Sequence, residues 1–159
     1  MADFERLVNL LARRGMTVCA AESCTGGLFA ARVVDVPDAS KVLDRSFVTY
    51  AAEAKRELVG VPAETIARYG VVSEPVAEAM ARGAALAGKA QAGVGITGLA
   101  GPSGGTEDCP VGTVCFGICV NGKCRVYTAR FGNIGRNAVR DKAADFAAER
   151  LTEWLEEDE

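Results

Sequence analysis

The dipeptide Asn121-Gly122 constrains the fold of this chain more than any other short segment. It separates two strand-like runs, "GTVCFGICV" and "KCRVYTARF". A two-residue Asn-Gly connection favours a type I′ turn, because that turn needs positive φ at both positions. The segment therefore predicts two antiparallel strands joined by a tight hairpin.

Elsewhere the sequence alternates amphipathic helices with short apolar strands. Helices begin at typical start residues such as Asp3 and Ser73. We expect helices over 3–15, 26–36, 53–60, 62–70, 74–88 and 136–157, and strands over 16–21, 46–52 and 92–97. This order predicts an α/β fold, a three-layer sandwich whose mixed sheet combines parallel strands with the antiparallel hairpin. With no repeat or internal linker, we expect a single domain over residues 1–159.

The charge pattern argues against several classes of partner. The 18 basic residues are outnumbered by 21 acidic ones, and they are scattered along the chain. Nucleic acids and anionic membranes require a concentrated basic patch, so we expect neither as a partner. The N-terminal "MADFERLVNLLARRG" is not a signal peptide, and no run approaches the roughly 20 apolar residues of a membrane helix. We therefore expect a cytoplasmic protein.

The six cysteines, at positions 19, 24, 109, 115, 119 and 124, include no C-x-x-C pair, and the chain has no histidine. A zinc site would have only Cys or carboxylate ligands to draw on. In a cytosolic compartment we expect reduced structural thiols and no bound metal. A metal or redox role for the cysteines is the alternative.

The loop "ESCTGG" follows a predicted buried strand and precedes a helix, which is where many hydrolases carry a nucleophile. Ser23 could attack a carbonyl, while backbone N–H groups of Thr25, Gly26 and Gly27 at the helix start stabilise the oxyanion. The alternative is that Ser23 or Thr25 only caps the helix. The absence of histidine means that a serine nucleophile needs another base.

Lys55 is the best-placed base among the five lysines, because it follows the predicted strand "FVTYAA" and should lie at the same end of the sheet as Ser23. An ordinary lysine is almost entirely protonated at neutral pH, so Lys55 would need burial or a nearby cation. Tyr50 closes that predicted strand and could relay or orient a proton. Alternatively, Lys55 is a solvated helix residue.

A second loop, "TGLAGPSGG", follows the strand predicted at 92–97 and is rich in glycine. It matches neither a Walker A loop nor G-x-G-x-x-G. Its backbone could form a phosphate cradle, or it could be an irregular turn. Arg136 and Arg140, near the start of the last helix, could bind an anion or remain exposed charges.

Five segments in this order resemble the C-terminal domain of the competence/damage-inducible protein CinA: "AESCTGG", "FVTYAAEAK", "GVVSEPVAEAMA", "GITGLAGPSGG" and "PVGTV". The resemblance runs from about residue 5 to residue 155. Larger members of this family carry a further N-terminal domain, and the chain is similar to the stand-alone form.

The resemblance implies a nicotinamide-nucleotide amidase, which converts nicotinamide mononucleotide and water into nicotinate mononucleotide and ammonia without a cofactor. It implies Ser23 as the nucleophile, Lys55 as the base and Tyr50 as a supporting group. It also implies a nucleotide site formed by the following residues: Thr97, Gly98, Gly101, Gly104, Gly105 and Arg140. The sequence around 131–140 differs in length from the family pattern, so Arg136 is the alternative to Arg140.

Two features of the sequence leave other interpretations open. Asp108-Cys109 stands where family members often have Glu-Lys, so a positive charge is absent near the proposed phosphate loop. A non-catalytic nucleotide-binding module with the same fold is the alternative to the amidase. Thiol chemistry at Cys24 is a third possibility, because a helix N-terminus favours a thiolate.

The apolar face of "VAEAMARGAALAG" suggests a homo-oligomer.

Overall fold

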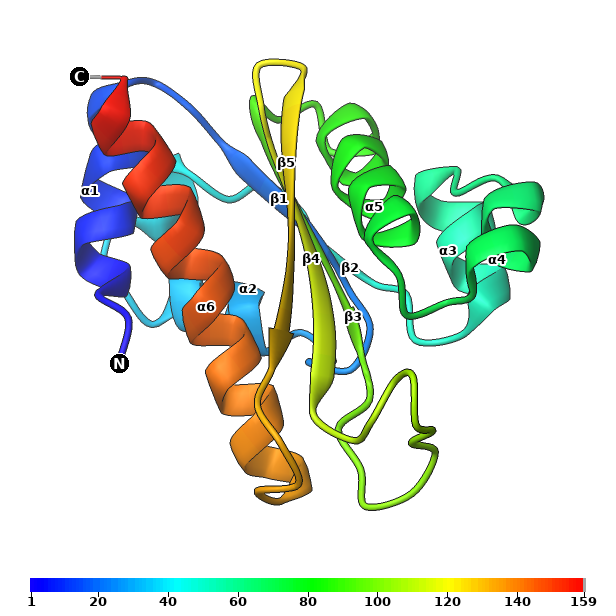
Figure 1. The fold of residues 1–159 in the computed structure, drawn as a ribbon. Coiled ribbons are helices and arrows are strands. Elements are labelled where there is room, and N and C mark those ends of the chain that lie inside the picture. The colour runs from blue at the N-terminus through cyan, green and yellow to red at the C-terminus, as the bar shows by residue number, and fades with distance from the viewer. Residues whose placement is uncertain (159) are drawn as a thin grey trace.

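A five-stranded mixed sheet separates two layers of helices (Figure 1). The computed structural model describes residues 1–158. Its elements follow in the order α1 (Phe4–Arg13), β1 (Val18–Glu22), α2 (Leu28–Val34), the 3₁₀ helix η1 (Ala39–Lys41), β2 (Phe47–Val48), α3 (Ala52–Val59), α4 (Ala63–Tyr69), α5 (Glu74–Ala87), β3 (Ala92–Gly98), β4 (Thr113–Val120), β5 (Lys123–Arg130) and α6 (Arg136–Glu157). The predicted three-layer α/β sandwich is confirmed.

The strand order is β2-β1-β3-β4-β5, and the pairing changes direction at β3. β1 pairs in parallel with both β2 and β3, whereas β3–β4 and β4–β5 are antiparallel. Asn121 and Gly122 both have positive φ, as the predicted hairpin requires. The mixed sheet with an antiparallel hairpin is therefore confirmed.

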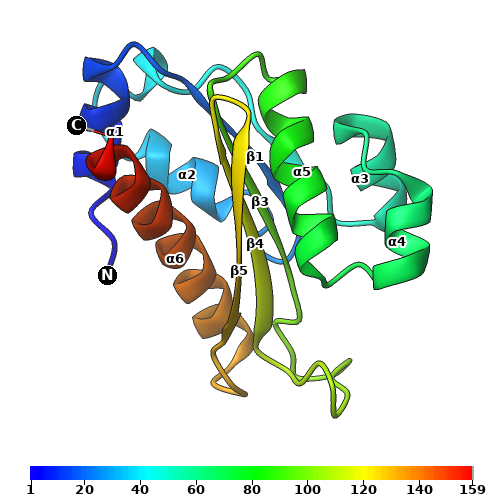
Figure 2. The ribbon, with the colours of Figure 1, turned by 45° about the horizontal axis from the view of Figure 1, so that its top comes forward.

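The two faces of the sheet are packed in different ways. α1, α2 and α6 cover one face with a large apolar core, while α5, flanked by α3 and α4, covers the other (Figure 2). α5 lies very close to the strands, because a Cβ added at Gly95 or Gly117 would lie 2.3 or 2.4 Å from the carbonyl oxygen of Ala77. Glycine at these strand positions therefore admits the backbone of the helix.

The strand predicted over 46–52 was too long, since β2 contains only Phe47 and Val48. The N–H of Thr49 still donates to the carbonyl of Glu22 on β1 at 2.7 Å, and the chain leaves the edge of the sheet after this bond. α3 begins at Ala52. Tyr50 therefore lies in a connection and does not close a strand.

The expectation of six reduced thiols was also wrong. Cys119 and Cys124 are joined by a disulfide, whereas Cys19, Cys24, Cys109 and Cys115 are free. The hairpin places Cys119 directly opposite Cys124, with 4.0 Å between their Cα atoms. The two-residue turn thus brings the sulfurs together.

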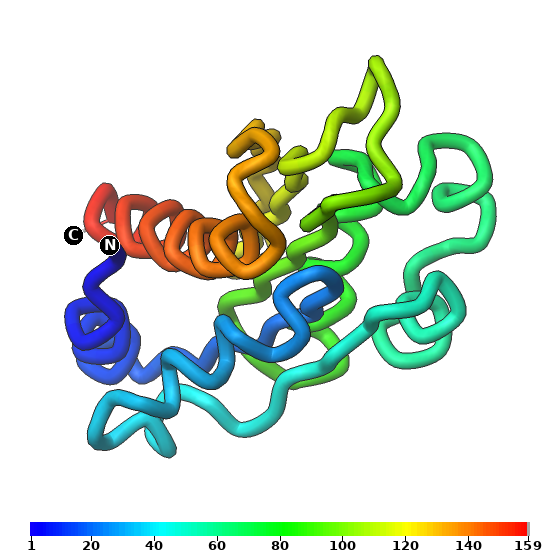
Figure 3. The backbone as a smooth tube through the Cα atoms, turned by 90° about the horizontal axis from the view of Figure 1, so that it is seen from below, coloured from blue at the N-terminus to red at the C-terminus, as the bar shows by residue number. Residues whose placement is uncertain are grey.

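The carboxyl ends of the parallel strands lie at one end of the molecule. The loop 99–112 and the turn before α6 project from this end, which is the lower end in Figure 1 and faces the viewer in Figure 3. Within residues 1–158, none of the helices combines the length and apolar character needed to cross a membrane.

Candidate active site

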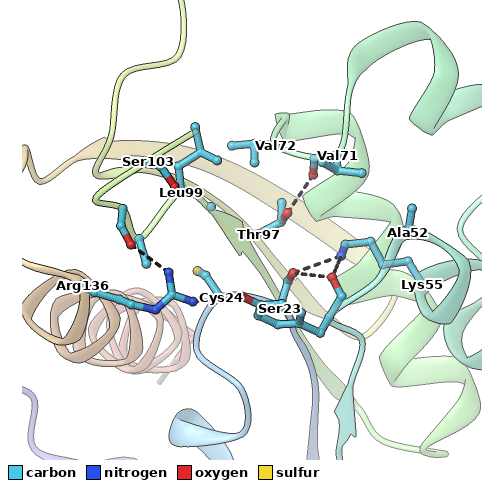
Figure 4. Close-up of a pocket in the computed structure, with 14 residues that line it drawn as sticks. Ser23, Cys24, Ala52, Lys55, Val71, Val72, Thr97, Leu99, Ser103 and Arg136 are labelled. Atoms are coloured by element: carbon cyan, nitrogen blue, oxygen red, sulfur yellow. Dashed lines mark hydrogen bonds between the residues drawn. The ribbon is translucent and has the colours of Figure 1, made fainter. Parts of the chain in front are cut away.

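A cavity of about 380 Å³ opens beyond the ends of β1 and β3 (Figure 4). Its volume falls in the usual range for small-molecule sites, roughly 300–1,000 Å³. It is lined by Ser23, Cys24, Tyr50, Ala52, Lys55, Val71, Val72, Thr97, Gly98, Leu99, Ala100, Gly101, Ser103 and Arg136. The two loops predicted from the sequence therefore meet at one cavity.

Ser23 is held at a sharp corner between β1 and α2. Its N–H donates to the carbonyl of Ile96 on β3, at 2.9 Å. The carboxylate of buried Glu22 accepts from the N–H groups of Phe29 and Ala30, at 2.9 and 3.1 Å. These bonds fix the strand end and the helix start relative to each other, so the Ser23 hydroxyl reaches the cavity.

Lys55 lies beside Ser23, with Nζ 3.0 Å from Oγ. Nζ also donates to the carbonyls of Thr49 and Tyr50, at 2.7 and 3.3 Å. The residue is only 1% exposed, and no Asp or Glu among residues 1–158 forms an ion pair with it. Burial lowers the pKa of Lys55 below the 10.5 of an ordinary lysine. Its amine is therefore more available as a base than that of a solvated lysine.

Cys24 lines the same cavity, but its thiol is not activated. Burial, as the largest effect, raises the pKa of Cys24 to about 11. At neutral pH the side chain is a thiol and not a thiolate. The interpretation of Cys24 as a nucleophile is therefore not supported.

Tyr50 takes part in the site differently from the expected proton relay. Its backbone carbonyl accepts from Lys55 Nζ and, at 3.4 Å, from the Ser23 hydroxyl. Its phenol is 60% exposed, and the phenolic oxygen accepts from Arg136 Nη2 at 2.9 Å. The side chain thus contacts the rim of the cavity, while the main chain contacts the Ser23–Lys55 pair.

The two arginines have separate positions. Arg136 lines the cavity, and its Nη1 donates to the carbonyl of Gly101 at 2.8 Å. Arg140 does not line it; its Nε and Nη2 each donate at 3.0 Å, to the carbonyls of Cys24 and Thr25 respectively. Arg136, the alternative in the sequence analysis, therefore lines the cavity, whereas Arg140 contacts the backbone of the Ser23 loop.

The remaining predicted residues divide in the same way. Thr97, Gly98 and Gly101 line the cavity, and the Thr97 hydroxyl donates to the carbonyl of Val71 at 2.7 Å. The other expected binding residues are not among those lining it: Thr25, Gly26, Gly27, Gly104 and Gly105.

Glu22 caps the helix that follows the Ser23 loop, because its carboxylate accepts from the N–H groups of Phe29 and Ala30. Of the three expected oxyanion donors, the Gly26 N–H donates to the carbonyl of Ser23 at 3.0 Å. The N–H of Cys24, directly after the nucleophile, donates to no carbonyl oxygen among the described residues, and the same holds for the N–H groups of Thr25 and Gly27. Sequence reasoning missed Glu22, although an acidic residue ending a buried strand was a visible signal. No cluster of His, Cys, Asp or Glu suited to a metal ion is found among residues 1–158.

Comparisons with known proteins identify relatives over almost the whole chain. The family described as the CinA C-terminal domain matches residues 3–155. A CinA-like protein of Kosmotoga olearia is 46% identical over 143 residues, which are 90% of this chain and 34% of that protein. One from Chlorobaculum tepidum is 49% identical over 86% of this chain and 34% of its own length. The chain spans about a third of the length of these curated relatives.

Solved structures show the same fold over nearly their full length. A competence/damage inducible protein of Agrobacterium tumefaciens is 38% identical with a TM-score of 0.90, covering 98% of this chain and 97% of its own. A CinA superfamily protein of Klebsiella pneumoniae is 36% identical with a TM-score of 0.92, covering 97% and 96%. Sequence and fold therefore point to the same family.

Proposed function

The chain belongs to the CinA C-terminal domain family, and we propose that it is a nicotinamide-nucleotide amidase of the serine/lysine type. It would hydrolyse the carboxamide of nicotinamide mononucleotide to the carboxylate and ammonia. The observation that carries the proposal is the 3.0 Å contact between Lys55 Nζ and Ser23 Oγ in a buried site where no carboxylate of residues 1–158 pairs with the lysine. A serine needs such a neutral base to become a nucleophile.

In the first half-reaction, neutral Lys55 takes the Ser23 proton as Oγ attacks the carboxamide carbon. The developing oxyanion is stabilised by the N–H of Cys24, the backbone donor next to the nucleophile, which bonds to no carbonyl among the described residues. Protonated Lys55 then gives its proton to the leaving nitrogen, and ammonia departs from an acyl-enzyme. In the second half-reaction, Lys55 takes a proton from water as the water oxygen attacks the ester carbon. Protonated Lys55 then returns this proton to the departing Ser23 Oγ, and the acid product leaves as the carboxylate after losing its own proton to solvent.

The rim of the cavity suits a substrate with an anionic group away from the carboxamide. Arg136 lies there, and a guanidinium binds phosphate through paired N–H donors. The two terminal nitrogens of Arg136 contact the carbonyl of Gly101 and the phenol of Tyr50. Leu99, Val71 and Val72 add apolar surface to the cavity lining, which suits an aromatic ring. The cytoplasmic location and the homo-oligomeric state remain predictions.

Release of ammonia from nicotinamide mononucleotide tests the proposal directly. Native protein should turn over, and Ser23→Ala should lose at least roughly 10⁴-fold in kcat because the nucleophile is absent. Cys24→Ala is the matched control: it keeps the backbone N–H and should retain turnover. Lack of ammonia from folded native protein would instead favour the non-catalytic nucleotide-binding module, for which Ser23→Ala would leave nucleotide affinity unchanged.

A further inference from the structure

An arginine of the last helix holds the backbone of the loop that carries Ser23 by hydrogen bonds. Arg140, on α6, reaches the loop through two bonds of 3.0 Å, from Nε to the carbonyl of Cys24 and from Nη2 to that of Thr25. Its third nitrogen, Nη1, donates to Asn137 on the same helix at 3.1 Å, which holds the guanidinium in place. A Cβ at Gly26 would lie 3.5 Å from Nη2, so the guanidinium packs directly against the loop backbone.

A hydrogen bond within the loop and the planarity of its peptides connect the Arg140 contacts to the direction of the Cys24 N–H. A trans peptide is planar, so its N–H points opposite to its C=O; the peptides of this loop are trans. Holding the Thr25 carbonyl therefore directs the Gly26 N–H, which donates to the carbonyl of Ser23 at 3.0 Å. Holding the Ser23 carbonyl in turn directs the N–H of Cys24 to the opposite side, away from the turn.

We propose that Arg140 is a positioning residue for the oxyanion donor: it fixes the Cys24 N–H through the Thr25–Gly26 and Ser23–Cys24 peptide planes, which the Gly26–Ser23 hydrogen bond links, and it contacts no substrate atom. This proposal rests on the proposed Ser23–Lys55 mechanism. An oxyanion donor acts mainly in the transition state, because it must be aimed at a charge that develops there. Loss of Arg140 should therefore lower kcat while leaving KM nearly unchanged.

A small serine-reactive fluorophosphonate tests this without relying on nicotinamide mononucleotide as the substrate. Ser23 Oγ forms the bond to phosphorus, fluoride leaves, Lys55 accepts the proton, and the phosphoryl oxygen occupies the oxyanion position. Arg140→Met should slow this labelling roughly 10- to 100-fold, less than the loss of about 100- to 1,000-fold caused by removing a donor outright. Arg140→Lys offers one nitrogen for two carbonyls, so its rate should fall between those of the native protein and Arg140→Met.

Arg32→Met is the matched control. Arg32 also joins α2 to α6, through Asp141 and Asp145 at 2.9 and 2.8 Å, but none of these bonds reaches the Ser23 loop. The variant Arg32→Met should have a lower free energy of unfolding than the native protein but the same labelling rate. The pH midpoint of labelling should be the same in all these proteins, because Lys55 keeps its contacts.

The outcomes separate this proposal from the proposed function. Native labelling rates in Arg140→Met, an equal loss in Arg32→Met, or a raised KM with unchanged kcat in Arg140→Met would each overturn the positioning role. Labelling of native protein without ammonia release would overturn only the choice of substrate, and the Arg140 comparison would still decide the role of this arginine. If native Ser23 is not labelled at all, both proposals fail.

Discussion

The two ends of the sheet differ in whether their basic side chains are paired. At the hairpin end, a disulfide joins Cys119 to Cys124, and Arg125 pairs with Glu157 at 2.9 Å while lying over the ring of Trp154. At the other end, the amine of Lys55 is buried, and none of the described carboxylates forms an ion pair with it. An uncompensated buried cation lowers stability. The hairpin end is therefore built for stability, whereas the loop end gives up stability for reactivity.

Lys55→Met should produce the largest effect on this contrast. The change removes the proposed base and should lower kcat at least roughly 10³-fold. It should also raise the free energy of unfolding at neutral pH, because a methionine of similar length has no charge to bury. Ammonia release and urea unfolding measure the two quantities on the same preparation.

Lys142→Met is the control for this experiment, since Lys142 is exposed on α6. Its free energy of unfolding should change by less than about 0.5 kcal/mol. If Lys55→Met lowered the free energy of unfolding as much as a substitution that leaves a cavity in the core, the idea that Lys55 is kept for chemistry would be contradicted.

The pH dependence should show the same contrast in the native protein. Since burial lowers the pKa of Lys55 below 10.5, turnover should fall about tenfold per pH unit below that lowered pKa and level off above it. The unfolded chain binds the proton of this lysine more tightly than the folded chain. The contribution of Lys55 to stability is therefore least favourable below the folded pKa and improves as pH rises toward 10.5. Rate and stability profiles of native protein and Lys55→Met would measure both; an acid limb centred at or above 10.5 would contradict the shift.

Arg136→Met should have a smaller effect, confined to binding. Losing a charged hydrogen-bonding partner of the substrate phosphate should raise KM for nicotinamide mononucleotide roughly 10- to 100-fold. The corresponding nucleoside lacks the phosphate, so its KM should change little. Equal increases for the two substrates would show that Arg136 shapes the cavity without contacting the anion.

The sequence was sufficient to predict the layers and the hairpin because these depend on local signals. Asn121-Gly122 determines a turn by backbone geometry, and the alternation of apolar segments determines the order of helices and strands. β2 was overestimated because "FVTYAA" has strand composition throughout. Its pairing with β1 stops after Val48 and the bond from Thr49 to Glu22, and no local pattern reveals where that pairing stops. The disulfide was missed although Cys119 and Cys124 are symmetric about the turn, a signal that the assumed reducing compartment outweighed.

The site was predictable where a residue type is chemically unusual and not where roles depend on distant contacts. The structure brings Ser23 and Lys55 together, as their positions after successive strands suggested. The different contacts of Arg136 and Arg140 were not predictable. The two residues are one turn apart along α6, so their spacing does not show which of them reaches the cavity. Only the fold shows that Arg136 faces the cavity and Arg140 faces the backbone of the Ser23 loop.

The smallest effect on activity is expected at the hairpin end, from the double variant Cys119→Ala/Cys124→Ala. Loss of a cross-link that closes so short a segment should lower the free energy of unfolding by about 2 kcal/mol. Turnover should stay within about twofold of native, because the hairpin turn pairs with Gln91 at the start of β3, away from the cavity. Thiol titration of denatured native protein should find the four free cysteines before reduction and all six afterwards. A large loss of turnover in the folded variant would show that the two ends are coupled, since β3 and β4 connect them directly.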